Sequence, residues 1–462
     1  MTDLAFLTVA EAGELLRGKK LSPVEYAKSL IERIEGNDTK LNAFLRLTPD
    51  IAMADAKRAE AEIARGDWRG PMHGVPYGLK DLVDHAGLPT TARSKILENN
   101  VAAADAVVMQ KLRAAGGVFM GKLSTHEFAI GGPDLPPPPV RNPWHRDYFS
   151  GGSSSGSAAA TAAGFLPATI GTDTGGSIRK PATLCGIVGM KATYDLVSRR
   201  GVIPLAFALD HVGPLTRTVR DNALLLDVIA GSDAHQPGST EIPTGGYTAE
   251  LGHGVKGLRI GVIRHFYTRD LDGDAEVVAS IEAALEVLAD LGASVREIST
   301  APLGDYAACN RTILTSEAFA IHEQWLRERP QDYASLTRER LLAGAFVRAV
   351  DYINAARVRA RLTSAFHGLF SDIDVAITAG TLDPTCRIDD TEELDRTYGR
   401  QAYTPFNVTG SPALSVPVGF SKAGLPLGMQ IVGKPYSEAM IYRVAHAYEQ
   451  ATRGAERHPA LG

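Results

Sequence analysis

The chain has 462 residues, of which 44% are hydrophobic and 22% are charged, as is typical of globular proteins. Its formal net charge of -5 is spread along the sequence, so neither a nucleic-acid partner nor a membrane partner is expected. The three cysteines, Cys185, Cys309 and Cys386, are widely spaced, which argues against a disulfide framework and against a cysteine zinc site.

The same features predict a cytoplasmic protein with one domain. Residues 1–10 lack the basic start and apolar core of a secretory signal. No apolar run reaches the ~20 residues that a membrane span needs. No linker or repeat divides the chain, so we expect a single domain over residues 1–462, with its Gly/Ser-rich core at about 74–215.

Capping residues and apolar spacing predict the elements in chain order. Ser22 followed by Pro23 is a typical helix start, because serine caps the first turn and proline suits the first helical position. Further elements are a helix over 51–64, a strand end or buried loop over 74–81 that carries Lys80, a helix over 104–115 and a buried strand over 117–122.

The stretch from 151 to 179 is unusually rich in Gly, Ser, Thr and Ala. A helix of small side chains over 157–163, ended by Gly164, is expected to pack tightly in the centre of the protein. The strand-like segment 166–170 leads into the turn 173–177.

Downstream, a strand, a helix and a strand follow one another, which indicates parallel pairing of the two strands. These elements and three further predicted strands lie at 258–263, 276–291, 293–298, 374–378, 413–418 and 429–432. Alternation of this kind predicts an α/β fold: a single large α/β/α sandwich with a mixed, twisted central sheet and helices on both faces.

Two of the glycine- and serine-rich loops match short motifs that predict other functions. Residues 171–177 resemble a phosphate-binding loop, but that motif needs a lysine after its last glycine, and here Ser177 follows Gly176. Residues 152–156 fit the pattern G-x-S-x-G, which would make Ser154 a nucleophile. Residues 142–148, which precede that pattern, do not form the buried strand that it requires.

Taken together, the two loops resemble the amidase signature family. The matching blocks, which extend in the family's order over nearly the whole chain, are 74–81, 142–144, 151–159, 171–182, 213–215 and 424–433. The resemblance implies a hydrolase of amide-type C–N bonds that uses Ser177 as nucleophile, Ser153 as bridging serine and Lys80 as base. It also implies a cis peptide bond between Gly152 and Ser153.

The chemistry of these three residue types is consistent with those roles. A serine hydroxyl is a poor nucleophile until a neighbouring base takes its proton. Lysine serves as a base only when it is neutral, so its pKa must fall through burial. The apolar neighbours Val75, Tyr77 and Leu79 agree with such burial. For Lys80 alone, a solvated surface lysine is the competing interpretation, and for Ser177 it is a helix-capping serine.

Backbone amides of Thr174, Gly175 and Gly176 are the expected oxyanion hole, because glycines let the backbone approach a substrate oxygen. Asp173 and Arg179 are expected to form an ion pair that holds the turn.

Lys180 and the histidines are the remaining candidates for a role in the site. Lys180 is expected on a helix surface, although it could attract an acidic substrate. The histidines His73, His85, His126 and His211 show no metal-ligand spacing, so no metal and no cofactor are expected, and satisfied or surface histidines are the default. A Ser-His-Asp triad built on one of them stays an alternative.

The substrate is expected to be a small uncharged amide, anilide or carbamate. Candidate pocket residues are Gly131, Gly132, Pro133 and Phe207. The family also contains the glutaminase subunit of the aminoacyl-tRNA amidotransferase, which works with partner chains. That subunit is an alternative, although residues 131–136 depart from its Ser/Thr/Glu/Asn-rich pattern. A catalytically dead binding member is a further alternative, and a homodimer is compatible with the sequence.

Overall fold

The computed structural model describes residues 3–132, 138–236, 239, 244–453 and 457–461. Its central element is an 11-stranded sheet with the strand order β1-β3-β2-β6-β8-β7-β12-β13-β11-β9-β10. In that order the strands are β1 (Phe44–Leu47), β3 (Val118–Leu123), β2 (Pro76–Lys80), β6 (Ala168–Asp173), β8 (His211–Thr216), β7 (Val188–Lys191), β12 (Ala413–Phe420), β13 (Pro426–Val432), β11 (Val375–Ala379), β9 (Arg259–Val262) and β10 (Ser294–Glu297). A separate two-stranded sheet pairs β4 (Arg141–Asn142) with β5 (His145–Phe149).

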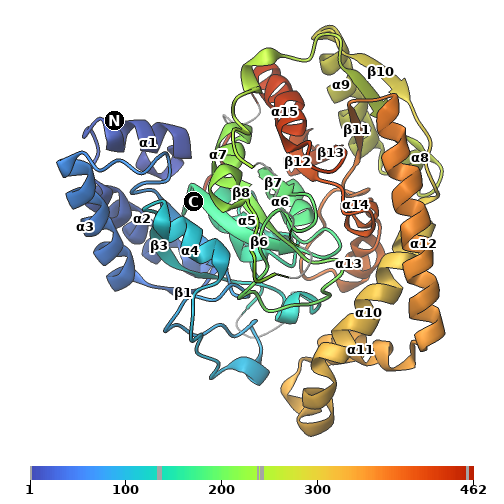
Figure 1. Ribbon diagram of the computed structural model, residues 1–462, viewed down its shortest axis with the longest axis horizontal. Helices are drawn as coiled ribbons and strands as arrows, with labels where there is room; N and C mark the ends of the chain where they lie inside the picture. Colours follow the sequence, from blue (N-terminus) through green and yellow to red (C-terminus); the bar gives the residue numbers. More distant parts are fainter. Residues whose placement is uncertain (1–2, 133–137, 237–238, 240–243, 454–456, 462) are drawn as a thin grey trace.

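Helices surround this sheet (Figure 1). They are α1 (Val9–Arg17), α2 (Pro23–Asn37), α3 (Pro49–Arg65), α4 (Val107–Ala114), α5 (Ser155–Ala162), α6 (Arg179–Cys185), α7 (Val219–Ile229), α8 (His265–Thr268), α9 (Ala275–Asp290), α10 (Leu303–Glu328), α11 (Ser335–Leu342), α12 (Ala349–Gly368), α13 (Thr391–Tyr398), α14 (Thr404–Val408) and α15 (Glu438–Thr452).

The sheet is mixed, and its parallel part places the candidate site. β2 pairs parallel with β3 and with β6, whereas β6 pairs antiparallel with β8. The carboxyl ends of β2 and β6 therefore lie at the same edge of the sheet as the start of β8, where Asp173 pairs with His211. Because Lys80 is the last residue of β2, its side chain is brought to that edge.

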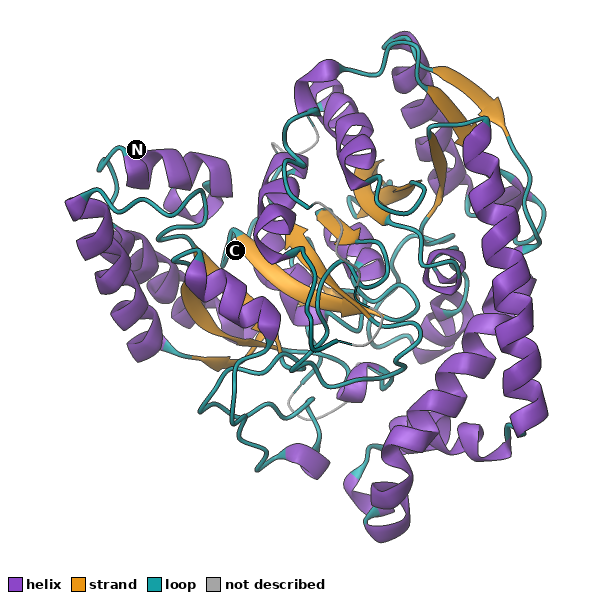
Figure 2. Ribbon diagram, in the orientation of Figure 1, coloured by secondary structure: helices purple, strands orange, loops and turns teal. Residues whose placement is uncertain are grey.

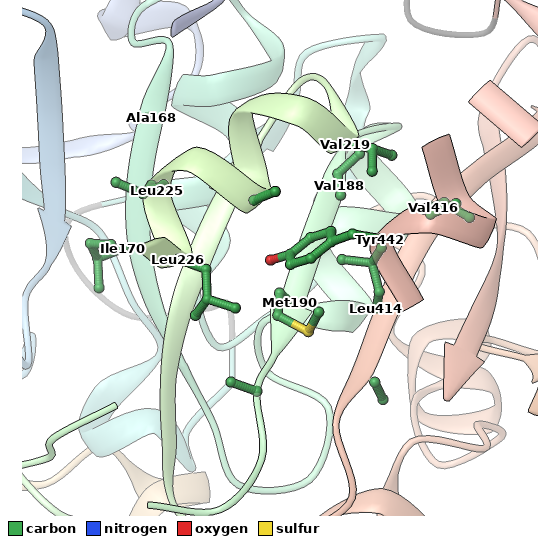
Figure 3. Packing of buried hydrophobic residues seen from close by; sticks show 14 of the residues in the cluster. Ala168, Ile170, Val188, Met190, Val219, Leu225, Leu226, Leu414, Val416 and Tyr442 are labelled. Atoms are coloured by element: carbon green, nitrogen blue, oxygen red, sulfur yellow. The ribbon is translucent and has the colours of Figure 1, made fainter. Parts of the chain in front are cut away.

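Alternate side chains of the central strands point to opposite faces of the sheet, and each face carries its own layer of core. On one face, Thr169 of β6 contacts α5 through its hydroxyl, which donates to the carbonyl of Ser157 at 3.0 Å. On the other face, α7 and α15 pack on strands β6, β7, β8, β12 and β13 (Figure 3). The side chains that fill this second layer include Ala168, Ile170, Val188, Met190, Leu225, Leu226, Leu414 and Tyr442. Helices thus cover both faces, as the alternation of elements predicted.

Local sequence signals account for several boundaries. The Ser22 hydroxyl accepts hydrogen bonds from the amides of Val24 and Glu25, and Pro23 is the first residue of α2, as predicted. β9 and β10 are parallel, as the strand–helix–strand pattern indicated. All eight residues of α5 are buried, in agreement with a central helix of small side chains.

Two long helices, α10 and α12, pack against each other beside the sheet and carry α11 at one end (Figure 2). Sequence patterns did not predict this arm. Among the described residues, no helix is both long and apolar enough to cross a membrane.

Candidate active site

Lys80 lies at the centre of a cluster of hydroxyl groups. Its Nζ is 2.7 Å from Ser153 Oγ, 2.7 Å from Thr172 Oγ1 and 3.0 Å from Ser154 Oγ. The lysine side chain has no exposed surface, and Ser153 is 1% exposed. The structure thus brings together Lys80 and Ser153, two of the predicted site residues, and adds Thr172, which the sequence did not single out.

Burial governs the protonation of this lysine. Removal from water lowers the pKa of Lys80 to about 7, while the carboxylates of Asp173 and Asp210 act in the opposite direction. A surface lysine would keep a pKa near 10.4. A large fraction of Lys80 is therefore neutral at physiological pH, and a neutral amine can accept a proton.

Ser154 is fully buried and engaged on every side. Its hydroxyl donates to the Thr172 carbonyl at 3.1 Å and accepts from the Thr172 amide at 3.2 Å and from Lys80. A serine so engaged is a poor nucleophile for an incoming substrate, which argues against the G-x-S-x-G interpretation. The peptide bond between Gly152 and Ser153 is cis, as the resemblance implied.

Ser177 lies in the turn before α6 and is half-buried. Its carbonyl accepts the amide of Ser154 at 3.1 Å, so the two glycine- and serine-rich loops abut. No side-chain hydrogen bond caps α6, and the Ser177 hydroxyl therefore does not act as its cap. The Asp173 carboxylate occupies that end of the helix, because it accepts the amides of Gly176 (2.8 Å), Ile178 (3.1 Å) and Arg179 (3.4 Å).

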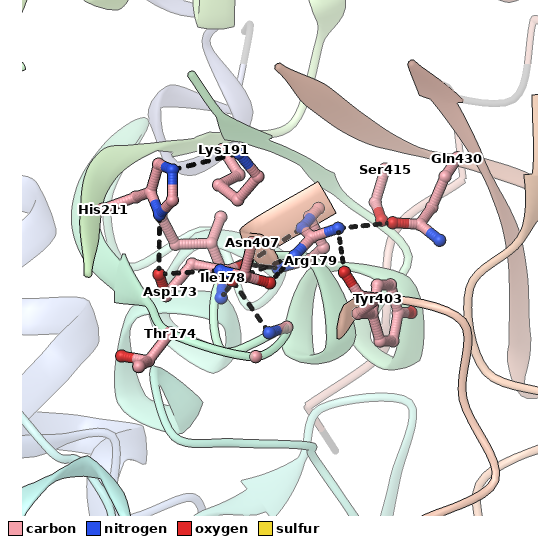
Figure 4. Close-up of polar contacts among 12 residues, drawn as sticks. Asp173, Thr174, Ile178, Arg179, Lys191, His211, Tyr403, Asn407, Ser415 and Gln430 are labelled. Carbon is pink, nitrogen blue, oxygen red and sulfur yellow. Dashed lines mark hydrogen bonds and ion pairs between the residues drawn. The ribbon is translucent and has the colours of Figure 1, made fainter. Parts of the chain in front are cut away.

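The expected ion pair between Asp173 and Arg179 forms, with a distance of 3.0 Å between Asp173 Oδ2 and Arg179 Nε, and both side chains are fully buried. Burial alone would raise the pKa of Asp173, but Arg179 and Asn407 hold it well below its usual range. The guanidinium also donates to the Gln430 amide oxygen at 2.7 Å, to Asn407 Oδ1 at 2.7 Å and to the Tyr403 carbonyl at 3.1 Å (Figure 4).

Gly176 has a positive φ of 124°, and a Cβ atom there would lie 2.8 Å from Cβ of Tyr403, so only glycine fits. Its amide donates to Asp173. This amide is therefore already engaged in the structure, whereas the sequence counted it with those of Thr174 and Gly175 as an oxyanion donor.

A cavity of about 470 Å³ opens beside the turn that follows β6. Its polar lining residues are Thr172, Thr174, Tyr194, Arg199, Arg200, Asp210, His211, His235 and Gln236. The other lining side chains are apolar: Leu82, Ala129, Val202, Ile203, Pro204, Leu205, Phe207 and Val212. Of the expected pocket residues, Phe207 lines this cavity, Gly131 and Gly132 do not, and Pro133 lies outside the described residues.

The charged side chains that line the cavity have hydrogen-bond or ion-pair partners, and Arg200 pairs with Asp233 at 2.9 Å. Asp210 accepts from the Thr174 hydroxyl at 2.6 Å and from the amides of Leu205 and Ala206. Burial raises the pKa of Asp210 to about 6, although these hydrogen bonds oppose the shift. Arg199 forms an ion pair with Asp195 at 2.5 Å. The cavity thus offers an apolar surface with little unpaired charge.

The expectation of a surface position for Lys180 is wrong. This side chain is 5% exposed, its Nζ donates to the Tyr398 carbonyl at 2.8 Å, and the ammonium lies 3.9 Å from the centre of the Tyr398 ring. Burial lowers the pKa of Lys180 to about 7. α13 covers this face of α6, a contact between segments about 200 residues apart that local sequence does not reveal.

The default for the histidines holds for most of them. His73 contacts Glu62 at 3.0 Å, His85 the Ala86 carbonyl at 2.9 Å and His211 the Leu209 carbonyl at 2.7 Å. His126 differs, because it is buried and neither ring nitrogen has a hydrogen-bond partner in the structure. Over the described parts of the chain, no group of three or more His, Cys, Asp or Glu residues is arranged to hold a metal ion.

The large mixed sheet and the buried lysine–serine cluster at its edge define the class of protein: a hydrolase of the amidase signature class with an α/β fold. The sequence profile of the family described as Amidase matches residues 25–442, and the chain belongs to this family.

Known relatives resemble the chain over almost its full length. The A subunit of the glutamyl-tRNA(Gln) amidotransferase from Geobacter metallireducens is 40% identical, over 97% of this chain and 98% of its own. Among solved structures, a chain from a vestigial protein complex that reveals the evolutionary origins of an s-triazine catabolic enzyme has a TM-score of 0.90 at 32% identity, covering 96% of this chain and 98% of its own. A peptide amidase from Stenotrophomonas maltophilia has a TM-score of 0.87 at 31% identity, with 98% of both chains covered.

Proposed function

We propose that the chain hydrolyses an amide-type C–N bond through an acyl-enzyme on Ser177, with Ser153 as proton relay and Lys80 as base. The observation that carries this proposal is the 2.7 Å contact between Ser153 Oγ and the fully buried Nζ of Lys80, whose pKa burial lowers to about 7. A base whose pKa lies near the working pH is the most effective at moving a proton.

The hydroxyls around Lys80 favour one direction of proton transfer. A neutral amine has two N–H groups and one lone pair. Since the Ser154 hydroxyl gives its proton to the Thr172 carbonyl, it can only accept from the lysine. If the second N–H points to Thr172 Oγ1, the lone pair is left for the Ser153 hydroxyl. Ser153 can then pass its proton to Lys80 and take one from Ser177.

The tetrahedral intermediate needs donors for its oxyanion. We assign the backbone amides of Thr174 and Gly175 to this role, with Gly176 contributing only if its amide leaves Asp173. One such donor is worth about 3 kcal/mol in the transition state. The Asp173–Arg179 pair supports the turn that holds these amides and does not touch the substrate.

The named relatives favour glutamine hydrolysis within a larger complex as the form of this activity. Curated relatives that are 36–40% identical over nearly the whole chain are the A subunits of glutamyl-tRNA(Gln) amidotransferases. In this proposal the chain releases ammonia from a primary carboxamide and works beside partner chains.

The apolar cavity favours a second form, a free-standing amidase for an uncharged amide, anilide or carbamate. Its charged groups are all engaged: Asp210 accepts from Thr174, Arg199 pairs with Asp195 and Arg200 pairs with Asp233. An anionic or zwitterionic substrate would find little unpaired charge there, whereas an apolar acyl or leaving group would bury its surface against Leu205 and Phe207. Structural similarity to the peptide amidase agrees with this form.

Assays of the purified chain without partners distinguish the two forms. Release of ammonia from glutamine, with no turnover of nitroanilides or aryl carbamates, supports the glutaminase form. The reverse pattern supports the free-standing amidase.

Ser177→Ala should abolish turnover in either case. Ser154→Ala serves as the matched serine control and should keep a measurable part of it, because Ser154 only orients Lys80. If Ser177→Ala kept activity, the proposed mechanism would be wrong.

A further inference from the structure

His126 is an unusual buried histidine. The side chain is 1% exposed, and neither Nδ1 nor Nε2 has a hydrogen-bond partner in the structure. A buried donor or acceptor without a partner costs about 1–3 kcal/mol. Stability alone would favour an apolar residue at this position, so the imidazole needs another explanation.

The ring is neutral at any working pH. Burial, together with the positive charges of Arg93, Lys80 and Arg340, lowers the pKa of His126 to about 3. The backbone of Gly131 acts in the opposite direction and raises this pKa slightly. His126 therefore does not exchange protons with the substrate, and its role must come from its shape and position.

That position is against the peptide that carries Ser153. The backbone amide of His126 donates to the Ser153 carbonyl at 3.2 Å. A Cβ atom added to Gly152 would overlap Cε1 and Nε2 of the ring and would lie 2.8 Å from Nδ1. The imidazole thus occupies the space that a side chain at position 152 would take.

The segment that carries His126 is firmly held. The neighbouring Glu127 carboxylate accepts from the Ser94 hydroxyl at 2.6 Å and from the Ala334 amide at 3.1 Å. Arg340 of α11 donates to the Ile130 carbonyl at 2.6 Å. The ring therefore packs against Gly152 from a segment that hydrogen bonds hold in place.

We infer that His126 is a positioning residue: its ring holds the Gly152–Ser153 peptide in place, keeps Ser153 Oγ on Lys80 Nζ, and fills space through which water would reach the lysine. This inference rests on the proposed roles of Ser153 and Lys80. It predicts two separate effects when the ring is removed, one on the rate and one on the pH dependence.

In His126→Ala the relay serine loses its support, so kcat should fall by about 10- to 100-fold with little change in KM. Water that enters the vacated space would hydrate Lys80 and raise its pKa. The acid limb of the kcat/KM profile should therefore move upward from about 7. Asp173 and Asp210, which also act on Lys80, are unchanged in this variant.

His322→Ala is the matched control. His322 is also fully buried, burial lowers its pKa to about 4, and its ring packs on Phe128 and Tyr333 away from the lysine. This variant should lose thermal stability but keep the acid limb in place. Added imidazole should restore part of the rate of His126→Ala and none of the stability of His322→Ala.

A double-variant cycle tests the contact itself. Gly152→Ala should be strongly impaired, because its Cβ collides with the ring. Gly152→Ala combined with His126→Ala should be no slower than His126→Ala alone, since the collision is gone, whereas independent effects would multiply.

If His126→Ala keeps both kcat and the acid limb while Ser177→Ala is inactive, His126 has no positioning role and only the inference falls. If Ser177→Ala is itself active, the proposed mechanism falls first. Should His126→Ala fail to fold, His126→Asn provides a smaller planar side chain with the same two readouts.

Discussion

At Lys80, the three surrounding hydroxyl groups set what the amine can do. Each oxygen lies within 3.0 Å of Nζ, and none carries a charge. An ammonium would need a counter-ion to offset its burial, but the carboxylates of Asp173 and Asp210 act on it only as more distant charges. Hydroxyls accept from a neutral amine as well as from an ammonium, so this environment tolerates both forms.

The pH dependence of turnover follows from this protonation. Because the base works only when it is neutral, kcat/KM should rise with pH through about 7 and level off above it. A lysine with an ordinary pKa would shift that rise to above pH 10. Steady-state rates between pH 5 and 10 measure the midpoint.

Lys180→Met is the control for this profile, because burial also lowers the pKa of Lys180 to about 7. The acid limb should stay where it is in this variant. If the acid limb disappeared in Lys180→Met, the titration would belong to Lys180 and not to Lys80.

At the scale of elements, the turn between β6 and α6 is held from one side by Asp173 and Arg179. The carboxylate accepts three backbone amides of the turn, and the guanidinium joins it to α14 and β13 through Asn407 and Gln430. Residues from three distant parts of the chain thus fix the turn that carries Ser177.

Arg179→Met should destabilise the protein by about 3–5 kcal/mol, because it leaves the Asp173 carboxylate buried without its partner. Denaturant unfolding measures the loss. Arg348→Met, which breaks an ion pair with Asp351 at the surface, is the control and should change the midpoint little. Similar losses in both variants would show that burial does not set the strength of the Asp173 pair.

The segment before β8 forms one wall of the cavity. Phe207 is 59% exposed at this wall, although it is a large apolar residue. In Phe207→Ala, KM for an apolar anilide should rise about 3- to 10-fold with kcat nearly unchanged, because contact area is lost in the ground state and transition state alike.

Phe346→Ala provides the control for that measurement, since Phe346 is 85% exposed on the helical arm and does not line the cavity. An equal change in both variants, or in neither, would exclude the cavity as the binding site.

At the scale of the whole molecule, one sheet joins strands from residues 44 to 432. β7 pairs with β12, so a strand near residue 190 lies beside a strand near residue 413 in the sheet. Such pairing leaves no strand boundary at which the chain could separate into two independent sheets.

We therefore predict a single cooperative unfolding transition for the chain, in keeping with the expectation of one domain. Far-ultraviolet circular dichroism and tryptophan fluorescence should give the same midpoint, because Trp68, Trp144 and Trp325 report from different elements. Two separated midpoints would divide the chain into two units.

Sequence by itself determined the local elements, and it predicted the candidate triad. Capping by Ser22 and Pro23, the small residues of α5 and the strand–helix–strand pattern over 258–298 depend on neighbours within a few turns, which a linear pattern contains. Lys80, Ser153 and Ser177 were predicted because several contiguous blocks, each weak alone, together resemble the amidase signature family in its order.

Only the tertiary structure decided which atoms these residues contact. Thr172 supplies the third hydroxyl that contacts Lys80. Tyr398 of α13 accepts the hydrogen bond of Lys180, and the His126 ring packs against Gly152. Each depends on packing between segments far apart in the chain, and residue type does not encode it. Burial likewise follows from the assembled core, and it is burial that lowers the pKa of Lys80 to the range that its proposed role as base requires.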